Sequence, residues 1–426
     1  MSAFRFLHAA DIHLDSPLRG LGGQEGGAAD RIRAATREAL EHLVTLAITD
    51  EVAFLIIAGD LYDGDWRDYR TGLFFAAQMG RLNEAGIPAF VLHGNHDAES
   101  QITRRLTLPE NVRVFGSRAP ETFRLDELGV ALHGQSFRRR DVRENLVPHY
   151  PEPLDHHLNI GVLHTGLGGM GGHENYAPCA LGDLVAKGYD YWALGHVHQF
   201  QWLHEHPHVV FPGNLQGRHI RESGAKGAVL VTVIDGVPAS VDPVPLDVVR
   251  WSLVPVLVDT NARVTDAVAG IRAALEQAVD QQADGRLLAC RVELRGRTAV
   301  HGQLLAAEAH LLAEARSVAL GLGVDAAWVE KVVVATRPDD GRDTGIAVSG
   351  DALGELHKML AEAHADPDLV ERLGKHPGQM LQRLPHALRA EIEQDSILDA
   401  ALDGDPRRLI EAVLPELLAR LTPEVD

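Results

Sequence analysis

Five short clusters of Asp, His and Asn are the residues of this chain whose types and spacing suit shared chemistry. Each lies at or near the end of a short apolar run that is typical of a buried strand. Ligands collect at the carboxyl ends of strands when helices flank a sheet, so we expect the five clusters to meet at one place. They are Asp11-Ile12-His13, Gly59-Asp60-Leu61-Tyr62-Asp63, Gly94-Asn95-His96-Asp97, His164, and Gly195-His196-Val197-His198.

The donor atoms in these clusters suit a pair of divalent metal ions. Asp11 and His13 are two residues apart, as are His196 and His198, so each pair points to one side of an extended backbone. Imidazole, carboxylate and amide oxygen without thiolate favour Mn²⁺, Fe²⁺ or Zn²⁺ over Ca²⁺ or a structural zinc. Seven candidate ligands exceed one ion's needs and match two ions that share a carboxylate: Asp11, His13, Asp60, Asn95, His164, His196 and His198.

Each cluster also has a plainer interpretation when it is taken alone. Asp-x-His and Gly-Asn-His-Asp can be simple turns, Asp60 can cap a helix, and His164 can be a hydrogen-bonded core histidine. The joint pattern is harder to explain in that way, because all five clusters lie at predicted strand ends. The sequence therefore favours one metal site over five unrelated turns.

Bulk properties describe an ordinary soluble chain. Its 426 residues suggest two or three domains, and 45% of them are apolar. No apolar run approaches the roughly 20 residues needed to span a bilayer. The absence of a visible signal peptide, with only Cys179 and Cys290, leads us to expect a cytoplasmic protein. The formal charge of −20 argues mildly against a nucleic-acid binder, although a bound cation pair would offset clustered Asp residues.

The order of predicted elements divides the chain into three parts. Strands and helices alternate from Phe4 to Leu92, and further strands follow as far as Pro245, which predicts a layered α/β domain over 1–248. A second strand–helix alternation predicts a small α/β domain over 249–338, with a single helix expected over 304–320. Short helices are expected over 339–426, a segment rich in acidic residues.

The order Asp-x-His, Gly-Asp-x-x-Asp, Gly-Asn-His-Asp, His, Gly-His-x-His resembles the calcineurin-like metallophosphoesterase superfamily. Within it, the chain is similar to DNA double-strand-break repair exonucleases of the SbcD type, and most to the YhaO-like branch. The closer likeness is carried by 11–17, Asn175-Tyr176-Ala177-Pro178-Cys179 and 211–219. The resemblance implies a β-sandwich flanked by helices and, on architecture alone, a small α/β capping domain. The helices expected over 339–426 do not match the family motif by motif. Their apolar residues can dock a partner or pack against the chain's own body.

The same resemblance implies a role for each site residue. One metal would be held by Asp11, His13, Asp60 and His198, and the second by Asp60, Asn95, His164 and His196. His96 would be the general acid rather than a ligand, and Asp63 its partner. An Asp–His pair fixes the ring and favours its protonated form, although Asp63 can equally cap the following turn.

Substrate and partners are less strongly indicated. Two basic groups are candidate DNA contacts, with a solvated surface as the alternative for the first: Arg138, Arg139, Arg140 and Arg143, then Arg218 and His219. Family resemblance implies DNA as substrate, an SMC-like coiled-coil ATPase of the SbcC type as partner, and often a homodimer. No membrane is expected.

Three functions compete on this basis. The first is a two-metal DNA exonuclease or endonuclease subunit in which a metal-activated water attacks phosphorus. The second is a phosphodiesterase or phosphatase for small phosphoesters. The third is a scaffold subunit of an ATPase complex whose metal site mainly holds the assembly together. The intact ligand set favours an enzyme, and Mn²⁺ is the expected metal.

Overall fold

The computed structural model describes residues 3–16, 27–63, 69–99, 107–169 and 175–339, together with Arg408. The predicted helical region 339–426 therefore lies outside the described residues, apart from its first residue and Arg408. The chain forms two compact units. The first contains Met1–Ser252 with Val279–Ala289 and Val324–Trp328, and the second is built around Leu253–Ala278 and Cys290–Gly323.

The first sheet of the first unit has the strand order β12-β11-β1-β2-β3-β4. Strands β1 to β4 run parallel, whereas β11 and β12 add an antiparallel edge. Strand β2 is the apolar run Phe-Leu-Ile-Ile-Ala and is wholly buried, as expected of a central parallel strand. The bounds are β1 Ala3–Ala9, β2 Phe54–Ala58, β3 Ala89–Leu92, β4 Val112–Val114, β11 Gly227–Ile234 and β12 Val237–Pro245.

The second sheet has the order β5-β6-β7-β8-β10-β9, with β6, β7, β8 and β10 parallel. Its bounds are β5 Glu121–Leu125, β6 Val130–Gly134, β7 Leu158–His164, β8 Tyr191–Gly195, β9 Gln201–Glu205 and β10 His208–Phe211. The sequence did not predict β9, or helix α3 (Leu181–Ala186). Strand β9 lies at the sheet edge with all its side chains partly or fully exposed, so it lacks an apolar run.

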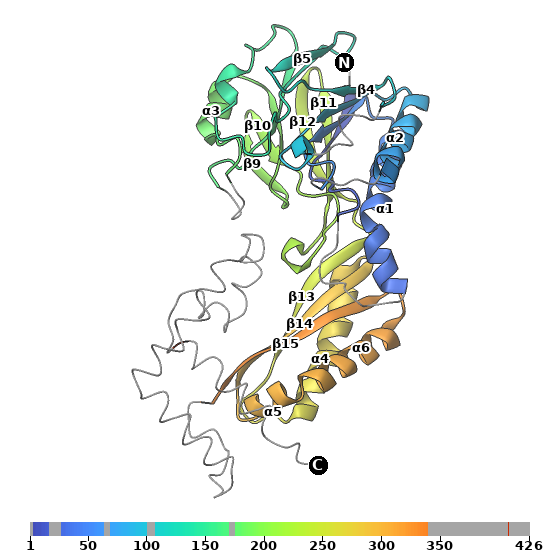
Figure 1. Ribbon diagram of the computed structural model, residues 1–426, viewed down its shortest axis with the longest axis vertical. Helices are drawn as coiled ribbons and strands as arrows, with labels where there is room; N and C mark the ends of the chain where they lie inside the picture. The colour runs from blue at the N-terminus through green and yellow to red at the C-terminus, as the bar shows by residue number, and fades with distance from the viewer. Residues whose placement is uncertain are drawn as a thin grey trace, which may run out of the picture. The chain divides into compact units, whose positions relative to one another are not determined.

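The two sheets pack face to face, and helices cover the first. Phe6, Phe54, Phe90 and Tyr191 fill the space between the sheets, with Phe6 and Phe54 stacked at 4.8 Å. Helices α1 (Gly27–Thr49) and α2 (Tyr69–Glu84) lie next to each other (Figure 1). Each buries one apolar side, and residues of both pack in one core with β1 and β2. The predicted helix-flanked sandwich is confirmed.

The second sheet-and-helix body has the strand order β13-β14-β15, with α4 and α6 packed together along it (Figure 1). Its strands are β13 Val249–Leu257, β14 Leu287–Thr298 and β15 Ala327–Pro338. Its helices are α4 Val264–Ala278, α5 His301–Ala306 and α6 Glu308–Leu322. The predicted single helix 304–320 is wrong, because the backbone leaves helical geometry at Ala307 and separates α5 from α6.

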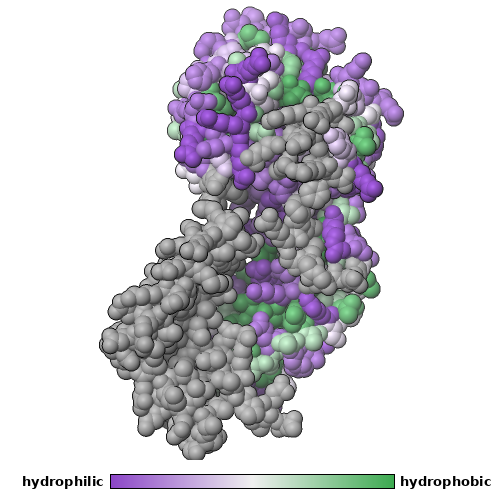
Figure 2. All heavy atoms as spheres, in the orientation of Figure 1, coloured by the Kyte–Doolittle hydropathy of each residue, from purple (hydrophilic) through white to green (hydrophobic). Residues whose placement is uncertain are grey.

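Polar residues dominate the visible face of the first unit, and apolar residues are scattered among them (Figure 2). Isolated apolar side chains are normal on a folded protein. Among the described residues, no helix is both long and apolar enough to cross a membrane.

Candidate metal centre

The carboxyl ends of five strands supply the site. Asp11 and His13 follow β1, Asp60 and Asp63 follow β2, and Asn95 and His96 follow β3. The facing sheet supplies His164 at the end of β7, then His196 and His198 after β8. Because β1 to β3 are parallel neighbours, and β7 and β8 are as well, their ends meet at one edge of the sandwich. The predicted convergence is confirmed by three overlapping groups of potential metal-binding atoms among the described residues. Two are described next, and the third, His13, Asp60 and His96, links them.

The first group consists of Asp11, His13 and His198. The Nε2 atoms of His13 and His198 are 3.3 Å apart, and His198 Nε2 is 3.7 Å from Asp11 Oδ1. Asp11 and His13 are almost wholly buried. Asp11 Oδ1 has no hydrogen-bond partner, although burial of an unpaired carboxylate oxygen is costly. A divalent cation is the ligand that this set of atoms fits.

The second group consists of Asp60, His164 and His196. His164 Nε2 lies 3.4 Å from Asp60 Oδ2 and 3.0 Å from Asn95 Oδ1, so the amide oxygen belongs to the same cluster. Asp60 Oδ2 also lies 4.0 Å from His13 Nε2. The same carboxylate oxygen therefore faces both groups. These clusters are consistent with a dinuclear metal site in which Asp60 is shared.

The backbone at the site is strained in a way that aims the side chains inward. Asp11, His13, Asp60 and His196 all have positive φ, with values of 50°, 45°, 52° and 105°. Non-glycine residues rarely adopt this conformation, and such strain persists only where surrounding contacts enforce it. Here the backbone N–H groups of Asp11 and His13 donate to the carbonyls of Gly59 and Asp60, each at 3.0 Å. These bonds tie the turn after β1 to the turn after β2.

Glycines make room for the ligands. A Cβ atom on Gly94 would lie 2.3 Å from Asp60 Oδ1 and 2.9 Å from His164 Cε1. A Cβ atom on Gly195 would lie 2.0 Å from the Ala58 carbonyl oxygen and 2.9 Å from His164 Nδ1. The glycine at the start of each of these two clusters is therefore required, because a side chain there would collide with a candidate metal ligand.

His96 and Asp63 form a pair beside the two groups. His96 Nδ1 donates to Asp63 Oδ1 at 2.9 Å. Burial acts to lower the pKa of His96, but the carboxylates of Asp60 and Asp63 outweigh it and raise that pKa above its usual value. The His96 ring is 30% exposed, whereas the candidate ligands His13 and His164 are at most 1% exposed. The geometry therefore provides an accessible imidazole at the edge of the cluster, and the neighbouring carboxylates favour its charged form.

Charges within the cluster are strongly coupled. Burial raises the pKa of the Asp11 carboxyl to about 7. Burial would also raise the pKa of Asp60, but the charges of His164 and His96 outweigh it and hold that pKa well below its usual value. Burial opposes protonation of His164, yet Asp60 raises its pKa to about 9. A buried cluster with opposing shifts of this size is typical of a functional site.

Two supporting carboxylates were missed by sequence reasoning. Asp97 accepts backbone hydrogen bonds from Leu61, Tyr62 and Gly94 at 2.8–3.1 Å, and so ties the turn after β2 to the turn after β3. Glu222 accepts a 2.7 Å hydrogen bond from His198 Nδ1. Asp97 belongs to the Gly-Asn-His-Asp cluster that the sequence analysis identified. Glu222 follows no predicted strand end, and no motif around it indicates a role at the site.

The predicted DNA contacts occupy different environments. Arg138, Arg139, Arg140 and Arg143 are exposed, and Arg143 pairs with Asp141 at 2.8 Å. The Arg218 side chain is only 14% exposed and donates to Glu222 Oε1 at 2.8 Å. His219 is 48% exposed. The role of these residues in DNA binding stays a prediction, but Arg218 is a largely covered neighbour of the histidine cluster rather than a fully exposed charge.

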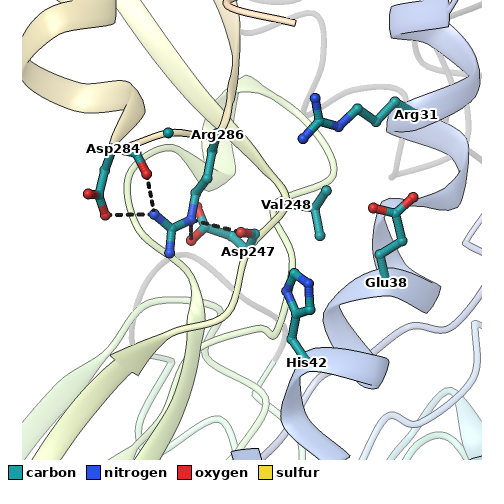
Figure 3. Close-up of a pocket in the computed structure, with 8 residues that line it drawn as sticks. Arg31, Glu38, His42, Asp247, Val248, Asp284 and Arg286 are labelled. Carbon is teal, nitrogen blue, oxygen red and sulfur yellow. Dashed lines mark hydrogen bonds and ion pairs between the residues drawn. The ribbon is translucent and has the colours of Figure 1, made fainter. Parts of the chain in front are cut away.

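A polar pocket of about 360 Å³ lies elsewhere in the first unit and shares no residue with the metal cluster (Figure 3). The Asp247 carboxylate forms ion pairs with Arg250 at 2.9 Å and with Arg286 at 3.0 Å, and Asp284 pairs with Arg286 at 2.6 Å. Arg31, Glu38 and His42 of α1 face them across the pocket (Figure 3). Because charges of both signs line it and Asp247 is already paired, this pocket has no clear preference for a charged ligand.

Two family models match the chain. The model described as calcineurin-like phosphoesterase matches residues 4–200. The model described as metallophosphoesterase YhaO, middle domain, matches residues 251–337. The first match contains every candidate metal ligand, and the second falls on β13 to β15 and their helices.

Relatives of known sequence agree with these matches. The uncharacterized metallophosphoesterase YhaO of Bacillus subtilis is 41% identical over 235 residues, covering 54% of this chain and 58% of its own length. The DNA double-strand break repair protein Mre11 of Sulfurisphaera tokodaii is 27% identical, covering 46% and 50% respectively. The chain thus spans about half the length of the curated relatives it matches. The solved structure of TT1561 from Thermus thermophilus, at 16% identity and a TM-score of 0.32, covers 54% of this chain and 94% of its own.

Proposed function

Because residues 4–200 match the calcineurin-like phosphoesterase family, we propose that this chain hydrolyses phosphodiester bonds in DNA, using two divalent cations. The observation that carries the proposal is the shared carboxylate of Asp60, which faces both ligand groups next to the His96–Asp63 pair. Two adjacent cation sites and a proton donor are the groups that a two-metal phosphoesterase uses.

Each residue has a defined task in the proposed reaction. Asp11, His13, Asp60 and His198 hold one cation, and Asp60, Asn95, His164 and His196 hold the other. Mn²⁺ is the proposed metal, since the donors are imidazole and oxygen. Bound cations of this kind acidify a water molecule and neutralise the phosphate oxygens. His96 donates its proton to the leaving sugar oxygen, and Asp63 holds the ring in position and favours its charged form.

Similarity supports DNA as the substrate. A relative at 27% identity is named as a DNA double-strand break repair protein, and its match extends over 46% of this chain. The exposed run Arg138, Arg139 and Arg140 follows β6 and is suited to contact with the phosphate backbone. We extend the proposal to an SMC-like coiled-coil ATPase partner and a homodimer on the same likeness alone. Small phosphodiesters are the second candidate substrate, because the YhaO relative is named only as a metallophosphoesterase.

One experiment separates these substrates. Full-length protein with Mn²⁺ is given end-labelled linear duplex DNA, single-stranded DNA and bis(p-nitrophenyl) phosphate in parallel reactions. Cleavage of DNA that disappears in Asp60→Asn supports the nuclease proposal. Turnover of the small diester without cleavage of either DNA, with or without a coiled-coil ATPase added, would move the proposal to a small-molecule phosphodiesterase.

The basic run is tested by the salt dependence of DNA binding. Arg138, Arg139 and Arg140 are changed together to Ala, and affinity for a DNA duplex is measured from about 50 to about 200 mM salt. Loss of three phosphate contacts should make the slope of log affinity against log salt shallower by up to about 3. The matched control changes three exposed arginines of the second unit to Ala: Arg263, Arg295 and Arg297. Equal slopes for both variants would assign the run to a solvated surface.

A further inference from the structure

Glu222 is a buried carboxylate that the proposed reaction does not yet use. It ends the short 3₁₀ turn Ile220–Glu222 and is 5% exposed. Its Oε1 accepts from His198 Nδ1 at 2.7 Å and from Arg218 Nη2 at 2.8 Å. Its Oε2 accepts from the Arg218 backbone N–H at 2.8 Å and from Asn214 Nδ2 at 2.9 Å. Arg218 Nε also donates to Oε2 at 3.3 Å, so this one side chain accepts five hydrogen bonds next to the metal cluster.

The contact with His198 fixes which ring nitrogen faces the cluster. With Nδ1 donating its proton to Glu222, Nε2 carries the lone pair. That atom lies 3.3 Å from His13 Nε2 and 3.7 Å from Asp11 Oδ1. Metal-ligating histidines generally donate their other N–H to a carboxylate or carbonyl, which sets the tautomer and strengthens the ligand. His198 has this arrangement, and Glu222 is its acceptor.

The contact with Arg218 reaches the other half of the site. Arg218 Nη1 lies 3.9 Å from Asp63 Oδ2 and 3.4 Å from Ser16 Oγ. Ser16 Oγ donates to the same Asp63 oxygen at 2.6 Å. The other oxygen of Asp63 accepts from His96 Nδ1 at 2.9 Å. A continuous line of polar contacts thus runs from Glu222 through Arg218 and Asp63 to His96.

We propose that Glu222 is a positioning residue that holds His198 in its metal-ligating tautomer and, through Arg218, holds Asp63 against His96. This rests on the proposed function, since it takes His198 as a ligand and His96 as the proton donor. It also gives Arg218 a task inside the site. Arg218 is hydrogen-bonded to a buried glutamate and faces Asp63. This position suits orientation of the Asp63–His96 pair better than contact with a DNA phosphate.

Metal binding tests the first half of the proposal without depending on turnover. Mn²⁺ titration of the metal-free full chain is followed by calorimetry for the wild type and Glu222→Gln, and melting of the metal-free forms is measured alongside. Loss of a carboxylate that supports a ligand typically weakens metal affinity about 10- to 100-fold. We expect one of the two Mn²⁺ binding steps to weaken by this factor. Glu330→Gln is the control, because it removes a carboxylate paired with Arg291 outside the site.

A double-mutant comparison assigns the effect to His198. In a chain that already carries His198→Ala, Glu222→Gln should cause little further loss of Mn²⁺ affinity, because the supported ligand is gone. Equal Mn²⁺ affinity in the wild type and Glu222→Gln, with only a lower melting temperature, would overturn the proposal and make Glu222 a structural residue. A wild-type chain that binds no Mn²⁺ would overturn the proposed function itself.

Arg218→Lys tests the second half. If Arg218 acts through Asp63 and His96, the variant should lower kcat for a diester with a poor leaving group, such as a nucleoside. It should affect a p-nitrophenyl diester less, because a good leaving group needs less protonation. KM should change little. A rise in KM for DNA, with kcat and the leaving-group dependence unchanged, would instead make Arg218 a substrate contact and overturn this half of the proposal.

Discussion

The Nε2 atoms of His13 and His198 lie 3.3 Å apart, although 185 residues separate them in the chain. His13 follows a strand of one sheet and His198 follows a strand of the other. Each points its outer ring nitrogen at the same point, next to a carboxylate oxygen of Asp11 that has no hydrogen-bond partner. Two imidazole lone pairs and a carboxylate brought together in this way favour a cation between them.

Metal binding should stabilise the folded chain. Mn²⁺ at about 100 times its dissociation constant should raise the free energy of unfolding by about 2.7 kcal/mol for each independent site. Urea unfolding followed by circular dichroism, with Mn²⁺ and then with excess chelator, measures this difference. Asp60→Asn removes the negative charge of the carboxylate that faces both groups and should abolish most of the gain. An equal gain in that variant would mean that Mn²⁺ binds elsewhere.

Replacement of His96 should separate chemistry from metal binding. We expect His96→Ala to lower kcat for DNA by about 10²- to 10⁴-fold, because the proton for the leaving oxygen is lost. The loss should be smaller for a p-nitrophenyl diester, and Mn²⁺ titration should still give two sites. Asp63→Asn keeps the His96 ring but removes the negative charge of its hydrogen-bond partner, so it should lower kcat by a smaller factor. DNA cleavage by His96→Ala at the wild-type rate would show that His96 is not the general acid.

Gly94→Ala should damage the site through packing alone. Its new Cβ would lie 2.3 Å from Asp60 Oδ1, so the shared carboxylate must move. We expect Mn²⁺ affinity to fall at least about 10-fold, as measured by calorimetry. Gly80→Ala is the control, since a Cβ there meets nothing within 4 Å. Gly80 lies in helix α2, where alanine should add up to about 1 kcal/mol of stability. Unchanged affinity in Gly94→Ala would show that Asp60 has room to move.

His8 should make the fold sensitive to acid. Burial lowers the pKa of His8 to about 3, and its ring nitrogens bond to Tyr191 Oη and the Leu194 carbonyl. The unfolded chain, with a pKa near 6.5 at this residue, therefore binds the proton first, and stability falls as pH decreases through the interval between the two values. From about pH 7.5 to about pH 5 the loss attributable to His8 should be about 2 kcal/mol.

His8→Leu should flatten this acid limb, because leucine takes up no proton. Urea unfolding at both pH values, in chelator so that metal binding does not contribute, gives the comparison. The decisive quantity is the change in stability between the two pH values, since the variant also loses the Tyr191 hydrogen bond. Parallel pH dependences in wild type and variant would assign the acid sensitivity to other groups.

Asp247 should be a stability residue rather than a functional one. It is buried and paired with Arg286 (Figure 3) and with Arg250, so Asp247→Ala leaves two guanidinium groups without this partner. We expect a loss of about 3–5 kcal/mol in the free energy of unfolding. Glu38→Ala, on the helix facing the same pocket, should change stability by less than about 1 kcal/mol. A loss below about 1 kcal/mol for both variants would mean that water replaces the carboxylate at no cost.

Much of this molecule is readable from local sequence. Strands β1, β2 and β3 are short apolar runs that end in polar clusters, and the predicted ligands stand at those ends. A strand that is buried on both faces of its sheet needs a continuous run of apolar residues, so it can be recognised in the sequence. Strand β9 was not predicted, because a strand exposed at the edge of a sheet does not need a continuous apolar run. The break between α5 and α6 was not predicted, because no proline or glycine lies at the break, Ala307.

The sequence by itself determined the kind of donor atoms, their order along the chain and the strand ends that carry them, since residue type and periodicity are local properties. Only the tertiary structure decided that Glu222 supports His198, that Arg218 is turned inward, and that one oxygen of Asp60 faces both groups. Those relationships depend on distances between segments far apart in the chain. Packing of two sheets and their loops sets such distances, and no spacing in the sequence records them.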